Sequence, residues 1–279
     1  MQVLVNKSAV IKEQLLQKLV DDGEKDESEA ARAGRRKVMM RAIYGEYVGT
    51  CIFFLPIFGS CANSYKLDWS QPFTNMAVAL VSGFHLISAI MCFSGVSGAQ
   101  FNPAISFSLW LTGKLSNRKF LFYMVVQMLA SITCMFIIFC TFTDPNEGMY
   151  TACTVRPEPD ADTDIIRVFM TEFVATFILT YVAFTIAFEE ADAQKKSTMS
   201  VQTLHETEGL TLFSSTPQSK SGFAPFAIGF TVFSLSLYGG SSGVSMNPVR
   251  MFGPAIFSGT SSIVVDVFAI NLLCIIVCI

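Results

Sequence analysis

Apolar residues are concentrated in six runs that are separated by polar segments. The runs cover approximately 38–60, 73–95, 120–142, 165–188, 222–240 and 263–279. A helix needs roughly 17–25 mainly apolar residues to cross the hydrocarbon core of a bilayer, and each run meets that length. Lipid also requires every backbone polar group to be satisfied internally, which favours helices over open sheets. The pattern therefore predicts an all-α membrane protein with six transmembrane helices.

The polar segments at both sides of these runs suggest how the chain is divided. Residues 1–37 form a charged tail, in which apolar positions over 3–20 are spaced for one face of a helix. We expect a cytosolic tail there, followed by one membrane domain at 38–279. Residues 189–221 are polar, rich in Ser and Thr and without periodicity, which is typical of a mobile loop on the inner side.

Two copies of one short motif, S-G-x-x-x-N-P, interrupt the apolar pattern. The first copy ends at Asn102 and Pro103, and the second ends at Asn247 and Pro248. Asn is a favoured N-cap residue and Pro is favoured in the first helical turn, so each motif predicts the start of a helix. The apolar stretches that follow are short, at about 104–112 and 249–258. We expect two re-entrant half-helices whose N-termini meet inside the membrane.

A second pair of matching residues extends this repeat over the whole domain. Glu46 and Glu172 each begin the pattern E-x-V-x-T in the first and fourth apolar runs, two runs before each Asn-Pro motif. The chain therefore contains a repeat of three helices, at about 38–142 and about 165–279. Because three crossings reverse the direction of the chain, the two halves must be inverted, and inverted repeats with broken helices place a site near the midplane.

Three charged residues lie within apolar sequence. Inserting a charge into the membrane there costs roughly 2.5–3.5 kcal/mol, so such a residue usually has a structural or functional role. We expect Glu46 and Glu172 to accept hydrogen bonds from the backbone N–H groups of the re-entrant loop in their own half. Proton relay in a coupled transporter is the alternative. The third is Arg250, three residues after Asn247.

Two helix N-termini that face one another create a positive potential, which repels cations and hydronium. The side-chain amides of Asn102 and Asn247 can donate hydrogen bonds to a central water while their oxygens cap the helices. Backbone carbonyls before each Asn offer a ladder of acceptors, which suits rapid passage with weak binding. These carbonyls belong to Gly98, Ala99, Gln100, Gly243, Val244 and Ser245.

These motifs together resemble the major intrinsic proteins, or aquaporins, over about residues 38–279. The resemblance rests on the pairs Asn102-Pro103-Ala104 and Asn247-Pro248-Val249, on Arg250, on the two glutamates and on Gly253-Pro254. It implies a bundle of six helices and two half-helices, one pore per subunit, and a homotetramer. It also implies that Arg250 lines a narrow outer constriction and excludes cations.

The resemblance further implies which residues surround Arg250 in that constriction. They are Ser82, Val244 and either Leu235 or Ser236, because counting from the two nearest motifs differs by one residue. Water-specific members resemble one another in having Phe and His at the Ser82 and Leu235 or Ser236 positions, which leaves a wider filter that admits small neutral solutes as an alternative. Glycerol-conducting members typically have Asp after the arginine, whereas this chain has Met251.

Composition and charge refine these expectations. The chain is 52% hydrophobic with 26 Phe and 15% charged residues, too apolar for a soluble domain. Fifteen Lys and Arg residues lie on one predicted side and three on the other, which favours cytosolic termini. We expect the protein in the plasma membrane or an intracellular vacuolar membrane. Of the eight Cys, only Cys61 and Cys153 lie near loops on the outer side, where a bridge between them is an alternative to free thiols.

No spacing of Cys or His suggests a metal site, and no nucleophile–base arrangement suggests an enzyme. We expect no cofactor and no nucleic-acid partner. The predicted function is a passive water channel that excludes ions and protons. The alternatives are an aquaglyceroporin-like channel for water plus glycerol, urea or similar neutral solutes, and an ion- or proton-coupled secondary transporter.

Overall fold

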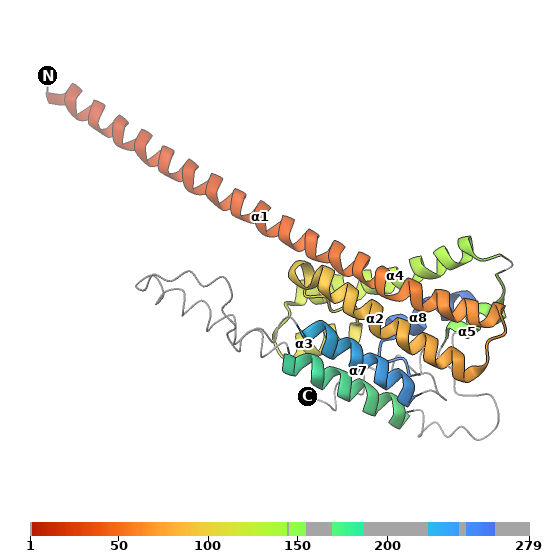
Figure 1. The fold of residues 1–279 in the computed structure, drawn as a ribbon. Coiled ribbons are helices and arrows are strands. Elements are labelled where there is room, and N and C mark those ends of the chain that lie inside the picture. Colours follow the sequence, from red (N-terminus) through yellow and green to blue (C-terminus); the bar gives the residue numbers. More distant parts are fainter. Residues whose placement is uncertain (1, 144, 155–168, 187–222, 240–243, 260–279) are drawn as a thin grey trace, which may run out of the picture. The chain divides into compact units, whose positions relative to one another are not determined.

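The structure is a computed structural model that describes residues 2–143, 145–154, 169–186, 223–239 and 244–259, with 2–28 and 30 by backbone alone. The chain divides into two compact units, Met1–Ala42 and Ile43–Ile279. In the first unit the described backbone is helical and belongs to α1 (Gln2–Lys66), so the predicted tail is helical well beyond residues 3–20. The second unit carries the remaining elements (Figure 1).

Four helices in the described part of the chain are long and apolar enough to cross a membrane. They are Ala31–Lys66 of α1, α2 (Gln71–Ser97), α4 (Asn117–Thr141) and the helix Phe169–Ile186, while α7 (Ala224–Tyr238) is apolar but shorter. These helices correspond to the first five predicted spans, and all regular structure among the described residues is helical. The predicted sixth span at 263–279 and the loop at 189–221 lie outside the described residues.

Two short helices follow the Asn-Pro motifs. The first, α3 (Pro103–Leu111), and the second, α8 (Pro248–Ser258), begin directly after Asn102 and Asn247, one residue earlier than the sequence pattern predicted. A further short helix, α5 (Glu147–Cys153), follows α4 in a segment that the sequence analysis assigned to a polar loop. The Asn146 side chain caps it by accepting from the Met149 N–H at 3.0 Å.

Glycines set how closely the helices of the second unit approach. Helices α2 and α7 pack together where Gly83 faces Gly229, since a Cβ on either residue would meet the other's carbonyl oxygen within 3 Å. Helix α8 packs on α4 at Gly253, where a Cβ would meet the Ser131 carbonyl oxygen at 2.5 Å. Small residues allow such close crossings in membranes, and a larger side chain at these positions would push the helices apart.

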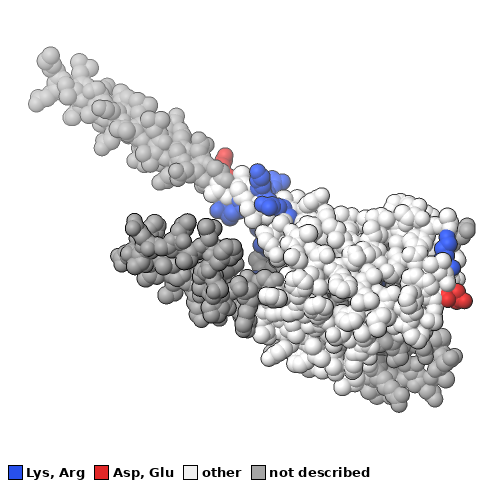
Figure 2. Space-filling view, in the orientation of Figure 1, with Lys and Arg blue, Asp and Glu red and all other residues white. Residues whose placement is uncertain are grey.

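Charged side chains of the second unit lie at its ends or deep inside it. On the face shown in Figure 2, the surface between the ends carries no charge. Charged residues of the second unit end or follow α1, follow α3, or begin α4 and α5, and the remaining ones in the described part of the chain, Glu46, Glu172 and Arg250, are buried or half-buried. Large apolar side chains such as Phe84, Leu121 and Phe136 are exposed on the helices between. This distribution is the one expected of a protein whose sides face lipid.

Candidate functional site

The two Asn-Pro motifs adopt the same local geometry. Asn102 has φ −149° and ψ 114°, and its side-chain oxygen accepts from the Ala104 N–H at 2.9 Å. Asn247 has φ −154° and ψ 116°, and its oxygen accepts from the Val249 N–H at 3.0 Å. Each Asn is therefore an N-cap followed by Pro in the first turn, which satisfies one of the free N–H groups at a helix start.

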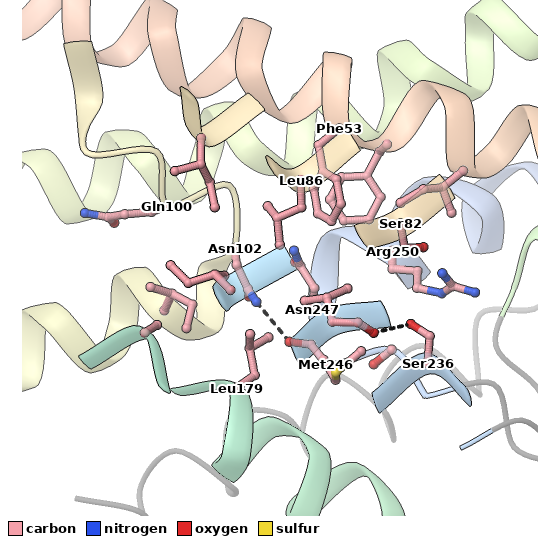
Figure 3. Close-up of a pocket in the computed structure, with 18 of the residues that line it drawn as sticks. Phe53, Ser82, Leu86, Gln100, Asn102, Leu179, Ser236, Met246, Asn247 and Arg250 are labelled. Atoms are coloured by element: carbon pink, nitrogen blue, oxygen red, sulfur yellow. Dashed lines mark hydrogen bonds between the residues drawn. The ribbon is translucent and has the colours of Figure 1, made fainter. Parts of the chain in front are cut away.

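The two loops are also hydrogen-bonded to each other. The Asn102 amide nitrogen donates to the Met246 carbonyl at 2.9 Å (Figure 3). The Asn247 amide nitrogen donates to the Phe101 carbonyl at 2.9 Å. Each amide thus gives one hydrogen to the opposite loop, a contact that was not predicted from the sequence. Because an amide nitrogen carries two hydrogens, each Asn retains a second donor.

The residue before each Asn has a left-handed backbone conformation. Phe101 has φ 47° and Met246 has φ 51°, a region that costs a non-glycine residue roughly 1–3 kcal/mol. In this conformation the carbonyl of each residue accepts from the opposite Asn, while its own N–H donates to a buried glutamate. The hydrogen bonds between the loops therefore hold a strained backbone in place.

Glu46 fixes the first loop. Its two carboxylate oxygens accept from the Gln100 N–H at 3.0 Å and the Phe101 N–H at 2.9 Å. They also accept from the Ser97 hydroxyl at 2.6 Å and from the Gln127 amide at 2.9 Å. The side chain is fully buried, so these donors replace the water that a carboxylate would otherwise bind.

Glu172 fixes the second loop in the same way. Its carboxylate accepts from the Ser245 N–H at 2.7 Å, the Ser245 hydroxyl at 3.1 Å and the Met246 N–H at 3.2 Å. Both glutamates thus contact the re-entrant loop of their own half, the arrangement that the repeat of E-x-V-x-T suggested.

A cavity of about 70 Å³ lies beside the joined loops. Its wall is mostly apolar, with Phe53, Leu86 and Leu179 among the lining residues (Figure 3). A smaller set of polar side chains faces it at intervals, and these are Ser82, Gln100, Asn102, Ser236, Ser245, Asn247 and Arg250. A cavity volume of about 10–15 Å³ is enough to hold one water molecule, so this cavity can hold several waters in contact with few polar groups.

The predicted constriction residues Ser82, Ser236, Val244 and Arg250 all line this cavity. Leu235, the alternative to Ser236, is buried and is not among the lining residues, so Ser236 is the one that faces the cavity. The Ser82 and Ser236 hydroxyls donate to the carbonyls of Val78 and Val232 at 2.7 and 2.8 Å, which leaves their oxygens as acceptors. The buried Arg250 Nε has no hydrogen-bond partner among the described residues.

A second cavity, of about 140 Å³, adjoins the first. Ala99, Gln100 and Ile105 line both cavities, and Gly98 lines the second. The Gln100 side chain accepts from the Ser106 hydroxyl at 2.7 Å. The sequence analysis included Gln100 only for its backbone carbonyl and missed its side chain, although a polar residue two positions before Asn102 was a signal.

The remaining predicted residues have supporting positions. Val249 is fully buried and, like Pro103, Ala104 and Pro248, is not among the residues that line the cavity. Val244 and Ser245 line the first cavity, while Gly243 lies outside the described residues.

Two polar residues of α4 anchor the half-helices, and the sequence analysis missed both. The Gln127 amide donates to the Ser106 hydroxyl of α3 at 3.1 Å. The Ser131 hydroxyl donates to the Val249 carbonyl of α8 at 2.5 Å and accepts from the Gly253 N–H at 2.9 Å. The two residues are one turn apart, so one face of α4 holds both half-helices. Polar residues at that spacing in an apolar span were the available signal.

In the part of the chain that the structure describes, no group of three or more His, Cys, Asp or Glu residues could hold a metal ion. The site is therefore built from amides, carbonyls, hydroxyls and one guanidinium.

Comparisons with known proteins identify the family of this chain. The family model described as Major intrinsic protein matches residues 34–215 and 209–274. Aquaporin-B from Dictyostelium discoideum is 37% identical over 224 residues, covering 80% of this chain and 75% of that protein. Probable aquaporin TIP2-2 from rice (Oryza sativa subsp. japonica) is 30% identical over 226 residues, covering 79% and 77%.

Among solved structures, the aquaglyceroporin from Plasmodium falciparum matches with a TM-score of 0.63 and 18% identity, covering 86% of this chain and 94% of that chain. This likeness shows that the fold is shared.

Proposed function

The chain belongs to the major intrinsic protein family of membrane channels, and we propose that within this family it is a passive water channel that excludes ions and protons. The observation that carries the proposal is the pair of hydrogen bonds between the Asn102 and Asn247 loops beside a narrow cavity. Membership of this family also means that the protein is not an enzyme.

Water passes through such a site by exchanging a few weak hydrogen bonds. Each Asn has one N–H that is not used between the loops, and the two can donate to the same water. A water that accepts from both must direct its own hydrogens away from the loops, which interrupts a proton-conducting file. The apolar residues between the polar groups bind water weakly, so exit is as rapid as entry.

Positive potential supports the exclusion of cations. The half-helices α3 and α8 begin at the joined loops, and each contributes roughly half a positive charge at its N-terminus. The Arg250 guanidinium adds a full charge on the same cavity. Cations and hydronium therefore meet an electrostatic barrier that a neutral molecule does not.

The buried glutamates disfavour the coupled-transporter alternative. Each oxygen of Glu46 accepts two hydrogen bonds, and those of Glu172 accept one and two. Neither residue lines the cavities. Carboxylates that hold loop backbone in this way are poorly placed to exchange protons with a transported solute.

A second candidate function is a channel for water plus small neutral solutes such as glycerol or urea. It is favoured by Ser82 and Ser236, whose side chains are small and whose oxygens accept hydrogen bonds beside the Arg250 donor. Together these groups would suit a solute that carries both hydroxyl or amide hydrogens and an acceptor oxygen.

Light scattering from proteoliposomes in a stopped-flow instrument tests both candidates. In a sucrose gradient we expect shrinkage to be faster than in empty liposomes, and the water-channel proposal fails if the rates are equal. In a glycerol or urea gradient, re-swelling supports the wider pore and its absence supports the water-specific one. Dissipation of a pH gradient during these experiments would indicate the transporter instead. Ser234→Ala is a suitable control because Ser234 is exposed and does not line the cavities.

The proposal includes a homotetrameric assembly and an orientation in the membrane with both termini in the cytosol. Exposed apolar residues on the helices, including Phe84 and Phe136, suit contact with lipid or with other subunits of a homotetramer. The excess of Lys and Arg in the N-terminal 41 residues and in the loop after α3 supports cytosolic N- and C-termini. The proposed location is the plasma membrane or a vacuolar membrane. Cross-linking in native membranes and protease protection of both termini would test these two points.

A further inference from the structure

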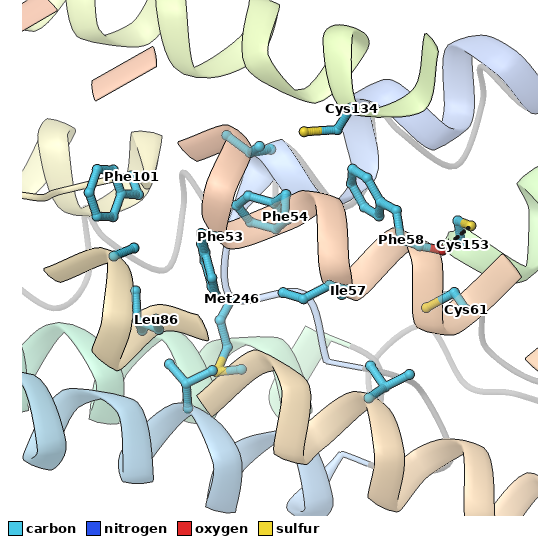
Figure 4. Close-up of a cluster of buried hydrophobic side chains, with 14 of the residues drawn as sticks. Phe53, Phe54, Ile57, Phe58, Cys61, Leu86, Phe101, Cys134, Cys153 and Met246 are labelled. Atoms are coloured by element: carbon cyan, nitrogen blue, oxygen red, sulfur yellow. Dashed lines mark hydrogen bonds between the residues drawn. The ribbon is translucent and has the colours of Figure 1, made fainter. Parts of the chain in front are cut away.

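Two cysteines from different helices lie side by side near the end of α1. Cys61 belongs to α1 and Cys153 is the last residue of α5, and both are free and almost completely buried. The Cys153 thiol donates to the Phe58 carbonyl of α1 at 3.5 Å, three residues before Cys61. Figure 4 shows the two residues at the same end of a cluster of buried aromatic side chains.

This pair is close to the polar end of the second unit. Cys61 is five residues before Lys66, which is exposed and donates to the Thr143 carbonyl at 3.5 Å just after α4. Helix α5 begins with the exposed Glu147 and is not one of the candidate membrane spans. A small polar oxidant can therefore approach this end without crossing the hydrocarbon core.

The protein offers a natural comparison in a second thiol pair. Cys51 of α1 and Cys134 of α4 are also neighbours, with the Cys134 thiol donating to the Cys51 carbonyl at 3.6 Å. Both of these residues lie well inside membrane-spanning helices. Oxidation proceeds through the thiolate, and a charge is costly at that depth, so the Cys51–Cys134 pair is the less reactive one.

We propose that Cys61 and Cys153 form a redox modification site, at which a hydroperoxide converts the two thiols into an intramolecular disulfide. One sulfur, as the thiolate, attacks a peroxide oxygen; the O–O bond breaks, a sulfenic acid forms, and the leaving hydroxide takes up the thiol proton as water. The second sulfur then attacks the sulfenic sulfur, and the S–O oxygen leaves with two protons as a second water. Overall, two thiols lose two electrons and two protons, and hydrogen peroxide is reduced to two waters.

The disulfide would connect elements on both sides of the candidate site. It closes a loop that contains α2, α3 and α4, and a cross-link of this kind restricts the unfolded chain. Helix α5 packs on α8, where the Tyr150 and Phe257 rings are 5.5 Å apart. Oxidation would therefore fix α5, and with it one face of the half-helix that carries Arg250, to the end of α1.

Peptide mapping of the full-length protein in liposomes tests the proposal directly. After hydrogen peroxide treatment, denaturation, N-ethylmaleimide labelling and digestion, we expect the number of labelled thiols to fall from eight to six. We also expect a linked pair of peptides that contain Cys61 and Cys153, which dithiothreitol should separate. Cys61→Ser and Cys153→Ser should each abolish the linked pair, whereas the Cys51→Ser, Cys134→Ser double variant should retain it.

The proposal is wrong if the wild-type protein yields only sulfenic or sulfinic acid on one of these cysteines, or if Cys61 and Cys153 remain labelled while another pair is linked. Because the wild-type map decides between these outcomes, a variant that fails to fold does not prevent the test. As a second readout, oxidation should raise the unfolding temperature of the wild type by roughly 5 °C, as expected for closing a large loop. The same treatment should leave that of Cys61→Ser unchanged.

Discussion

The two re-entrant loops share one geometry but are held in place by different groups. In both, an Asn caps a half-helix, the preceding residue has a left-handed φ, and a buried glutamate accepts from the loop backbone. The first loop is further held through Gln127, which contacts both Glu46 and Ser106. The second is held through Ser131, which contacts α8 directly. The repeat therefore supplies the shared core, and non-repeated residues of α4 adapt each half to it.

The lining of the cavities differs between the loops as well. Gln100, from the first loop, lines both cavities and is neutral, while Arg250, after the second loop, lines only the first and is charged. The inverted repeat thus produces a symmetric centre with two unlike approaches. Substitutions that affect one loop and spare the other can test which of these differences matter.

The largest expected effect is on the glutamates. Glu46→Leu and Glu172→Leu each leave two buried backbone N–H groups without an acceptor, at roughly 1–3 kcal/mol per group. We expect the unfolding temperature in detergent to fall in both, and further in Glu46→Leu because the Gln127 amide also loses an acceptor. Glu46→Gln and Glu172→Gln each leave one backbone N–H without an acceptor. Their unfolding temperatures should therefore fall by less than those of the Leu variants, and by equal amounts. A greater loss for Glu172→Leu would contradict the stated asymmetry.

The next effect is on ion exclusion. Arg250→Ala removes a unit charge from the cavity, which at an effective dielectric of about 20 and a separation of about 8 Å contributes roughly 2 kcal/mol to the barrier for a cation. We expect proton or sodium leakage to increase by roughly tenfold or more while water flux is retained, as measured with a pH-sensitive dye in proteoliposomes. Gln100→Ala, the neutral counterpart from the first loop, should not leak. Equal leakage in both variants would mean that the charge is not the cause.

A smaller effect is expected on the attachment of α8. Ser131→Ala removes the hydroxyl that bridges the Val249 carbonyl and the Gly253 N–H, and we expect a cost of about 1–3 kcal/mol. Thermal unfolding should reveal it, with Ser234→Ala as the control, because the Ser234 hydroxyl donates to the Phe230 carbonyl on its own helix. If the two variants unfold at the same temperature, α8 does not depend on Ser131.

The smallest effect concerns the Gln100 side chain. Gln100→Leu removes a hydrogen-bonding group from the wall that the two cavities share, and one such group contributes about 0.5–1.5 kcal/mol. We expect water flux per channel to fall by a few-fold in the sucrose assay. Gln71→Leu, the same change at an exposed position, provides the control. A flux that equals the wild type would show that water does not use this side chain.

Much of the fold could be predicted because its determinants are local. The length of an apolar run indicates a membrane-spanning helix, and Asn followed by Pro indicates the start of a half-helix. The second to fifth predicted spans and both half-helices therefore agree with the described helices to within a few residues. The short helix α5 was missed because its seven residues lie in a polar segment without a distinct period. The continuation of α1 through the charged tail was also underestimated, since charge alone does not prevent helix formation.

The residues of the candidate site could be predicted from the sequence, but the hydrogen bonds between them could not. The sequence indicated that Asn102, Asn247, Glu46 and Glu172 belong together, because they recur in matching context. It did not indicate that each Asn donates to the opposite loop, nor whether Leu235 or Ser236 faces the cavity. A one-residue difference turns a helix by about 100°, so only the packing of α7 against α2 selects the residue that lines the wall.

By itself the sequence determined the family, the membrane-spanning helices and the two capped half-helices, because hydrophobic length and helix capping depend on neighbouring residues. The tertiary structure decided how residues far apart in the chain meet. It joined the two Asn loops, placed Gln127 and Ser131 of α4 on both half-helices, and brought the Cys61 and Cys153 thiols together. Those contacts depend on the rotation and separation of packed helices, which no single segment of the sequence specifies.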